Sequence, residues 1–507
     1  MKRGKMMTPN TSRAGGARSG RWLATALAAG LVLAACANDD GAEPADDTAP
    51  AATAAPEPTG TEAPDTTDAE PTDTEPTDTE PTETTPPAPD FEPTTLTMWA
   101  GVTDQVGIEA FEPVLRRCEA DNPWLTIDYV GKDGLGLALS AAIEAGEPPD
   151  LVQADLTGQL ASIQAAELAV SVTDLAERDG LDWDAFVPAG VKLLEFNGER
   201  YGLPFSLDTV GLFYNQDVLD EIGVDGPPDT FDELLTDAQK LLVVSDDGAV
   251  ERVGFVPDVG DGSYALYFAD MFGATLYSDD GATITIGDSI DQWIEAAQWQ
   301  KQFYDLMDAD EFARWADGLG SYDSADNFFI NGQVPLYFES SFFVTWPDRF
   351  GEGQPEEWGV VPMPVPGGVD EENPVTLVPS GNWFMIPNGV DDVEKSWAAL
   401  KCLAFASEEI ASFQEAFGNI PSNIEALDLF EEVTVAKLPQ FKTFIDLARS
   451  SNASVPGSSL VSGALSDEMT ALLLDHRRGD VSDDQLRDEL LALNDRYQDE
   501  LDLELGN

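Results

Sequence analysis

The chain of 507 residues is poor in the residues that hold metals and build nucleophilic sites, with three cysteines and a single histidine, His476. Structural zinc is held by clusters of thiolates and imidazoles, so we expect no metal site, and no motif suggests a cofactor. Any Ser-His-Asp triad would depend on His476 alone. That residue lies in the segment DHRRG at 475–479, which is typical of a solvated helix end, so we do not predict a triad.

Basic side chains are also scarce. The chain has 26 Lys and Arg residues against 95 Asp and Glu residues, which gives a formal net charge of −69 at pH 7. A surface of this sign repels phosphate backbones and anionic lipid headgroups. The composition therefore argues against nucleic acid and against an anionic lipid surface as partners.

The apolar run at the N-terminus is too short to span a bilayer. It covers 14 residues, 22–35, and follows a stretch with six basic side chains, whereas a membrane span needs about 20 residues. A basic leader, a short apolar run and small residues before a break predict a signal peptide at 1–35. Cys36 follows Leu33-Ala34-Ala35, a pattern that resembles a bacterial lipobox and predicts lipidation at Cys36. The alternative is an ordinary signal peptide in which Cys36 is incidental.

The next segment, 36–92, has the composition of a tether. It contains 17 acidic residues, no basic residue and one aromatic residue, and the pentapeptide EPTDT begins at both Glu70 and Glu75. Such a sequence buries too little apolar surface to offset the entropy of ordering, so we predict a disordered acidic Pro/Thr linker. It would hold a folded domain away from the membrane.

Strand and helix patterns alternate after residue 93. The hydrophobic pattern predicts strands at 95–100, 125–130 and 151–154, with helices at 108–120 and 135–145. Alternation of this kind is typical of an α/β architecture, which binds ligands beyond the carboxyl ends of its strands.

Several short motifs follow one another along the chain: LTMWAG at 96–101, AAIEAGEPPDL at 141–151, NGERYGLP at 197–204, LFYN at 212–215, PDTFDEL at 228–234, NGQ at 331–333, WGVVPMP at 358–364 and GNIP at 418–421. In this order they resemble family 1 extracellular solute-binding proteins, the carbohydrate receptors of ABC importers, of which maltose-binding protein is the best-known member. Each motif is weak alone, but their shared order covers most of residues 94–507.

The resemblance implies a two-lobed periplasmic-binding-protein-like (type II) α/β fold with hinge strands that cross between the lobes. Lobe 1 would combine 94–207 with 380–430, and lobe 2 would combine 210–378 with 436–507. The crossings would fall near 207–210, 378–381 and 433–440. Because the two helices that carry Cys118 and Cys402 would then be neighbours in lobe 1, the resemblance also makes a disulfide between them plausible. Two buried free thiols are the alternative.

The resemblance also implies a function. The protein would be a lipid-anchored monomer at the extracellular face of the cell membrane that binds a carbohydrate between its lobes. It would deliver that ligand to two ABC permease subunits and their ATPase.

Aligning the motifs gives candidate ligand-binding residues, since sugars need aromatic faces for their C–H surfaces and paired polar groups for their hydroxyls. Acidic and amide candidates lie at strand ends and at the first crossing, and aromatic candidates lie where relatives have rings at the cleft. The candidates are Asp104, Gln153, Asp155, Asp208, Glu339, Phe342, Trp346 and Trp383.

Some features leave alternatives open. Ala154 stands where the maltose receptor has a tryptophan, and the segment PGSS at 456–459 has no aromatic residue nearby, so maltose itself is in doubt. Acidic cleft residues suit a polyamine or another cationic solute equally well. A secreted glycoside hydrolase would need two carboxylates at a defined separation, and no compact motif marks such a pair. A signalling lipoprotein would share the site and lack the permease.

Overall fold

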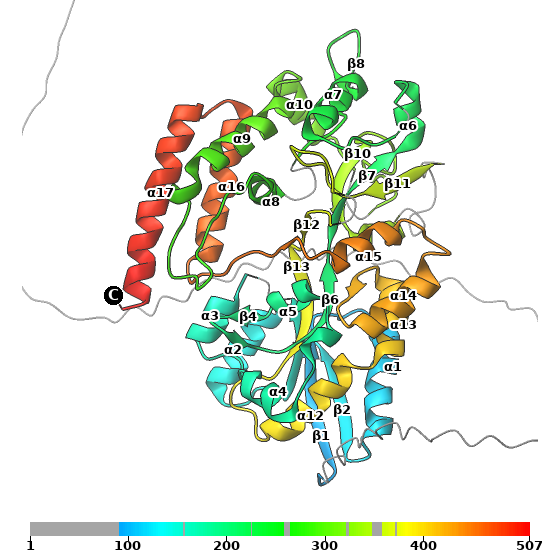
Figure 1. Ribbon diagram of the computed structural model, residues 1–507, viewed down its shortest axis with the longest axis vertical. Helices are drawn as coiled ribbons and strands as arrows, with labels where there is room; N and C mark the ends of the chain where they lie inside the picture. The colour runs from blue at the N-terminus through cyan, green and yellow to red at the C-terminus, as the bar shows by residue number, and fades with distance from the viewer. Residues whose placement is uncertain are drawn as a thin grey trace, which may run out of the picture. The chain divides into compact units, whose positions relative to one another are not determined.

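The computed structural model describes residues 91–155, 158–224, 226–257, 264–320, 324–346, 357–370 and 373–506. The predicted signal peptide, Cys36 and nearly all of the predicted linker lie outside these residues. The described part of the chain forms two lobes, each built on its own β-sheet with helices around it (Figure 1).

Lobe 1 is built on a mixed six-stranded sheet with the order β14-β6-β13-β3-β1-β2. Strands β1, β2 and β3 run parallel, whereas β13 is antiparallel to both β3 and β6. The strands are β1 (Thr94–Ala100), β2 (Leu125–Gly131), β3 (Leu151–Asp155), β6 (Leu203–Asp208), β13 (Ser380–Met385) and β14 (Ile420–Pro421). The three strands predicted from the sequence are confirmed.

Helices cover this sheet. They are α1 (Gln105–Asp121), α2 (Leu135–Ala145), α3 (Leu160–Ala165), α4 (Thr173–Asp179), α5 (Pro188–Lys192), α12 (Val393–Ala404), α13 (Ser407–Phe417) and α14 (Ile424–Thr434), with a short 3₁₀ helix η1 (Trp183–Ala185) and the hairpin β4 (Glu195–Phe196) and β5 (Glu199–Arg200). Helix α2 has the predicted bounds. Helix α1 starts before the predicted residue 108 because Asp104 caps it, its Oδ1 accepting the N–H of Gly107 at 2.9 Å.

The core of lobe 1 lies between the sheet and the helices α1, α12 and α13. Phe111 of α1 is 3% exposed, and its ring centre lies 5.7 Å from that of Phe205 and 5.2 Å from that of Phe413. Burying one such phenylalanine contributes about 1.5–3 kcal/mol. Helices α1 and α12 carry the cysteines, and a disulfide joins Cys118 to Cys402 with Cα atoms 5.6 Å apart.

Lobe 2 is built on an antiparallel three-stranded sheet with the order β10-β7-β11, surrounded by helices and two small strand pairs. Its strands are β7 (Val210–Asn215), β8 (Val243–Val244), β9 (Val250–Arg252), β10 (Leu336–Ser340), β11 (Trp358–Val361), β12 (Thr376–Leu377) and β15 (Ala453–Ser454). Its helices are α6 (Gln216–Glu221), α7 (Phe231–Leu241), α8 (Tyr264–Met271), α9 (Ile290–Tyr304), α10 (Ala309–Ala316), α15 (Phe441–Arg449), α16 (Ser462–Arg478) and α17 (Asp483–Glu504), with 3₁₀ helices η2 (Gly287–Ser289) and η3 (Ser341–Thr345).

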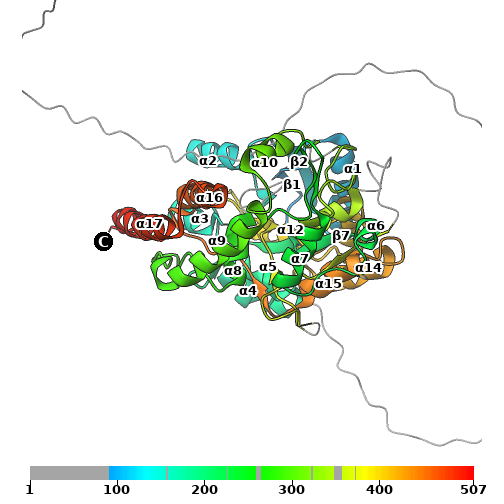
Figure 2. The same ribbon diagram turned by 90° about the horizontal axis from the view of Figure 1, so that it is seen from above.

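The C-terminal helices α16 and α17 lie side by side and pack with α9 (Figure 2). His476, in the last turn of α16, is 0% exposed, and its Nε2 lies 2.8 Å from Asp483 Oδ1 in the first turn of α17. The prediction of a solvated helix end is therefore wrong for this residue. The long helix α17 covers it, and a local sequence pattern does not reveal that packing.

The chain passes between the two sheets three times. Strand β6 continues into β7 through Thr209, β12 leads into β13 through residues 378–379, and α14 leads to α15 through residues 435–440. At the first passage Thr209 is 0% exposed, and its carbonyl accepts the N–H of Ser341 at 3.1 Å. The passages therefore bring residues far apart in sequence to one place.

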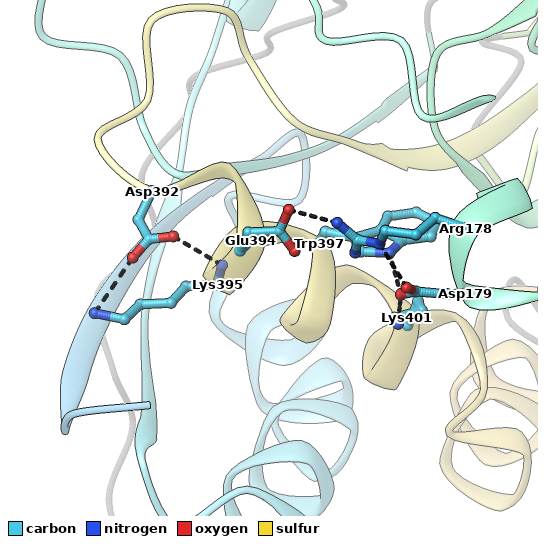
Figure 3. A network of polar contacts seen from close by, with 7 residues as sticks. All are labelled: Arg178, Asp179, Asp392, Glu394, Lys395, Trp397 and Lys401. Carbon is cyan, nitrogen blue, oxygen red and sulfur yellow. Dashed lines mark hydrogen bonds and ion pairs between the residues drawn. The ribbon is translucent and has the colours of Figure 1, made fainter. Parts of the chain in front are cut away.

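A charged network fastens α4 to α12 on lobe 1 (Figure 3). Asp179 accepts hydrogen bonds from Trp397 Nε1 at 2.9 Å and from Lys401, and it pairs with Arg178 at 2.8 Å. Arg178 also pairs with Glu394 at 2.6 Å. The bond from Arg178, followed by those from Lys401 and Trp397, holds the pKa of Asp179 well below its usual range despite partial burial.

We predict that Asp179→Ala lowers the free energy of unfolding by about 1–3 kcal/mol at pH 7, because the buried Trp397 N–H loses its acceptor. The depressed pKa fixes the sign of the pH dependence. The carboxylate stabilises the fold above its unfolded-state pKa of about 3.9, and this contribution disappears as the pH falls further.

Urea unfolding at pH 7 and pH 3 tests this, with Glu177→Ala, an exposed acid on the same helix, as the matched control. A deficit for Asp179→Ala that is equal at both pH values, or equal to that of the control, would contradict the prediction.

We also predict that reducing the Cys118–Cys402 disulfide lowers stability by a few kcal/mol, because the cross-link closes a long loop in the unfolded chain. The two cysteines are 284 positions apart in sequence. Mass measurement with and without alkylation after reduction detects the bond, and thermal unfolding of Cys118→Ala/Cys402→Ala measures its effect. Equal melting temperatures for oxidised and doubly substituted protein would contradict the expected stabilisation.

Candidate functional site

Asp208 lies at the end of β6, one residue before the first passage between the lobes. The register of the sheet sets it opposite Ser380, whose Oγ donates a hydrogen bond to Asp208 Oδ2 at 2.6 Å. Asn419, which follows α13, donates its side-chain N–H to the other carboxylate oxygen. One carboxylate therefore ties β6 to β13 and to the turn before β14.

A second polar contact lies on the neighbouring strands. Gln153 of β3 donates its side-chain N–H to Asn382 Oδ1 of β13 at 2.9 Å. Asn382 stands opposite Asp155, the exposed last residue of β3. We refer to Asp208, Ser380, Asn419, Gln153 and Asn382 together as the crossing cluster.

The environment of Asp208 favours its neutral form. Asp208 is 8% exposed. Burial is the largest influence and raises its pKa to about 7, the negative charges of Asp155 and Glu339 add to the increase, and the bonds from Ser380 and Asn419 oppose it. Near neutral pH the population of molecules therefore contains both forms of this side chain. The ionised form only accepts hydrogen bonds, whereas the neutral form can also donate one.

Two aromatic rings come from lobe 2. Phe342 and Trp346 lie at the start and just past the end of η3, with ring centres 5.9 Å apart, and both are half-buried. Gly418, next to Asn419, has a φ of +86°, and a Cβ there would lie 2.9 Å from Phe342 Cα. This close approach sets the aromatic pair beside the crossing cluster.

The arrangement supplies what a polyhydroxylated ligand requires. The carboxylates of Asp155 and Asp208 are strong acceptors, and the amides and hydroxyl of the crossing cluster both donate and accept. The rings of Phe342 and Trp346 offer apolar faces next to these polar groups. Five of the residues proposed from the sequence are therefore gathered at the passage between the lobes: Gln153, Asp155, Asp208, Phe342 and Trp346.

Glu339 lies nearby but is bonded to protein groups. It is 2% exposed, and its carboxylate accepts hydrogen bonds from Tyr264 at 2.8 Å, Tyr337 at 2.6 Å and the Ser340 N–H at 2.7 Å. These bonds anchor the end of β10. Glu339 acts on the site through its charge, which raises the pKa of Asp208, and this corrects the expectation of a direct ligand contact.

Trp383 does not present a ring to the site. Its side chain is 1% exposed and belongs to an apolar cluster that contains residues of both lobes. The register sets it opposite Ala154 and Pro204, and the small side chain of Ala154 leaves room for the indole inside the lobe. An indole enclosed in this way has no face for a sugar ring, so the expected stacking role is wrong.

Asp104 is exposed and serves as the N-cap of α1. Its Oδ1 accepts the N–H of Gly107, and contact of this residue with a ligand stays a prediction. Capping is the common role of an aspartate directly before a helix.

The sequence analysis missed Ser380, Asn382 and Asn419 as site residues. Asn419 lies in the motif GNIP at 418–421, Ser380 lies within the predicted second crossing at 378–381, and Asn382 directly follows that crossing. The signal that could have identified them is their position, because polar residues at a crossing face the junction of both lobes.

No group of three or more His, Cys, Asp or Glu side chains within the residues that the structure describes is arranged to hold a metal ion. No helix in the described ranges has both the length and the apolar character needed to cross a membrane.

Comparison with known proteins identifies relatives of this fold. A binding protein of Brucella abortus (strain 2308) is 27% identical over 376 residues, covering 72% of this chain and 84% of the relative. The maltotriose-binding protein of Pyrococcus abyssi is 26% identical over 259 residues, or 51% of each chain.

Solved structures share the two-lobed architecture. The structure of CpMnBP1 with mannotriose bound superposes with a TM-score of 0.65 at 21% identity and covers 79% of this chain and 99% of that one. The sugar-binding protein MalE from Xanthomonas citri gives a TM-score of 0.65 at 19% identity, with coverage of 80% and 97%. These likenesses show the fold.

Family membership rests on the sequence match. The model of the family described as bacterial extracellular solute-binding protein matches residues 104–409, more than half of the chain. The matched range contains the lobe 2 sheet, four of the six strands of the lobe 1 sheet, and two of the three passages between the sheets. The chain belongs to the bacterial extracellular solute-binding protein family.

Proposed function

We propose that this protein is the substrate-binding component of an ABC importer and that it captures a carbohydrate between its two lobes. The observation that supports this most directly is the crossing cluster of lobe 1 beside the Phe342–Trp346 pair of lobe 2. Relatives are described as maltotriose-binding or carry mannotriose, so we propose a mono- or oligosaccharide ligand.

The proposed lobes are 94–207 with 380–430 and 210–378 with 436–507. Rotation about the three passages would open and close the site. A ligand that contacts both lobes favours the closed population, and the transporter responds to that shift. Binding alone is sufficient for this role, so we propose that the sugar is released unchanged.

Anchoring and delivery follow from the same proposal. Lipidation at Cys36 would hold the chain at the extracellular face of the membrane, with residues 36–92 as the spacer. A monomer would then meet two permease subunits and their ATPase. Metabolic labelling with a fatty acid in the wild type and in Cys36→Ala tests the anchor.

A cationic solute such as a polyamine is the second candidate. The observation that favours it is the effect of Asp155 and Glu339 on Asp208, because negative charge that raises the pKa of a buried carboxyl also attracts an amine. A binding screen therefore includes spermidine beside the sugars.

We predict that maltotriose, mannobiose or another oligosaccharide of a screening set raises the melting temperature. A ligand at about a hundred times its Kd adds about 2.7 kcal/mol of stability. Trp346→Ala and Asp208→Asn should reduce this gain, because the first removes an aromatic face and the second replaces a carboxyl group that can carry charge with a neutral amide. Isothermal calorimetry gives the matching loss of affinity.

The control is Trp383→Phe, which changes a ring in the core and should leave the affinity unchanged. A sugar-dependent gain that is equal in the parent, Trp346→Ala and Asp208→Asn would refute the proposed site. A gain with spermidine alone would select the second candidate. Release of reducing ends during incubation would identify a glycoside hydrolase instead.

We predict that Asp208→Asn becomes more stable relative to the parent as the pH rises from about 4 to about 7. The folded-state pKa of Asp208, about 7, lies above that of an unfolded aspartate. Folding therefore favours the protonated form, and the parent loses up to about 1.4 kcal/mol per pH unit across this window, whereas asparagine does not titrate.

Urea unfolding of both proteins between pH 4 and pH 8 measures the difference, with Asp155→Asn as the comparison at an exposed neighbour. A stability difference between the parent and Asp208→Asn that does not change with pH would contradict the raised pKa.

A further inference from the structure

Ser458 connects the two lobes through a contact made only of protein groups. It lies between β15 and α16, in the part of the chain that packs with lobe 2. Its Oγ accepts the N–H of Ala161 at 3.0 Å and donates to the carbonyl of Gly158 at 2.9 Å. Both partners belong to lobe 1, almost 300 positions earlier in the sequence.

The partners of Ser458 have no local substitute for it. Gln159, which precedes α3, makes no side-chain hydrogen bond to the helix, so the Ala161 N–H depends on the hydroxyl that comes from the other lobe. Ser458 is only 8% exposed. An N–H left without an acceptor in such a place is costly, so the contact favours the arrangement that contains it.

The backbone around Ser458 is closely packed from both lobes. Gly281 of lobe 2 has a φ of +64°, and a Cβ there would lie 2.1 Å from the Ser458 carbonyl oxygen and 3.0 Å from Phe196 Cε2 of lobe 1. The segment at 458 is therefore held between a lobe 2 turn and the β4–β5 hairpin. A side chain at Gly281 would separate them.

The lobes also meet at a second place. Gly418 of lobe 1 approaches Phe342 and Thr345 of lobe 2, where an added Cβ would lie 2.9 Å from Phe342 Cα and 3.2 Å from Thr345 Cγ2. This contact is a steric fit. Of these two meeting places, the one at Ser458 is the polar one.

We propose that Ser458 is a positioning residue for ligand capture, which holds the lobes closed by direct contact with Gly158 and Ala161 and so limits the rate of ligand entry. The contact contributes to closure with or without a ligand, because all its atoms belong to the protein. Its effect on ligand capture rests on the proposed function, whereas its effect on the lobes does not.

The test compares the full chain with Ser458→Ala and with Ser451→Ala as the matched control. Ser451 lies in the same connecting region, and its hydroxyl donates to Asn373 of lobe 2. Small-angle scattering without ligand measures lobe opening, and amide hydrogen exchange measures protection at Ala161. Stopped-flow fluorescence with maltotriose and mannobiose measures the association rate.

We expect Ser458→Ala to have a larger radius of gyration than the parent. Amide hydrogen exchange at Ala161 should be faster. The ratio of closed to open molecules should fall about tenfold, because two hydrogen bonds are lost. The association rate constant should rise by up to the same factor as the open fraction grows. A substitution that only destabilises the fold would not raise the association rate constant. The control should match the parent in all three measurements.

The proposal is overturned if the scattering curve and the association rate of Ser458→Ala superpose on those of the parent. If scattering shows opening while neither sugar binds, Ser458 has the proposed role and the carbohydrate function fails. If the sugars bind and Ser458→Ala changes nothing, the function stands and the role of Ser458 is rejected.

Discussion

The carboxylate of Asp208 is the constraint on which the arrangement of the site depends. It accepts hydrogen bonds from Ser380 of β13 and from Asn419, which directly precedes β14. Asp208 itself directly precedes the passage into lobe 2. A buried polar group is costly unless it is hydrogen-bonded, so these two donors and the carboxyl group require each other. This polar contact thereby fixes the position where the lobes join.

The junction between the lobes combines this fixed polar centre with contacts that can separate. Phe342 reaches Gly418, and Ser458 reaches Ala161, in each case with one partner on each lobe. Residues within the sheet, such as Gln153 and Asn382, stay paired whatever the lobes do. A binding protein needs this division, because the site must keep its shape on one side while the other side moves.

Elements and topology could be predicted from the sequence where the local hydrophobic pattern agrees with the order of the family's motifs along the chain. Helix α2 and the three parallel strands follow from hydrophobic period and turn residues, and the position of Asp208 at a crossing follows from the motif order. The errors concern burial. Trp383 and Glu339 were assigned from the resemblance, and His476 from its local sequence. Trp383 and Glu339 are enclosed by residues far away in the chain, Ala154 and Tyr264, and His476 is enclosed by the next helix, α17.

The sequence alone determined the compositional class, the alternation of strands and helices, the family and the residues that begin each passage between lobes, because these depend on local pattern and order. Only the tertiary structure decided which polar groups meet. Asn419 bonds to Asp208 across 211 positions, and Ser458 to Ala161 across 297. The first pairing is set by the strand order within the lobe 1 sheet and the second by the contact between the lobes, and no local feature of either segment specifies its partner.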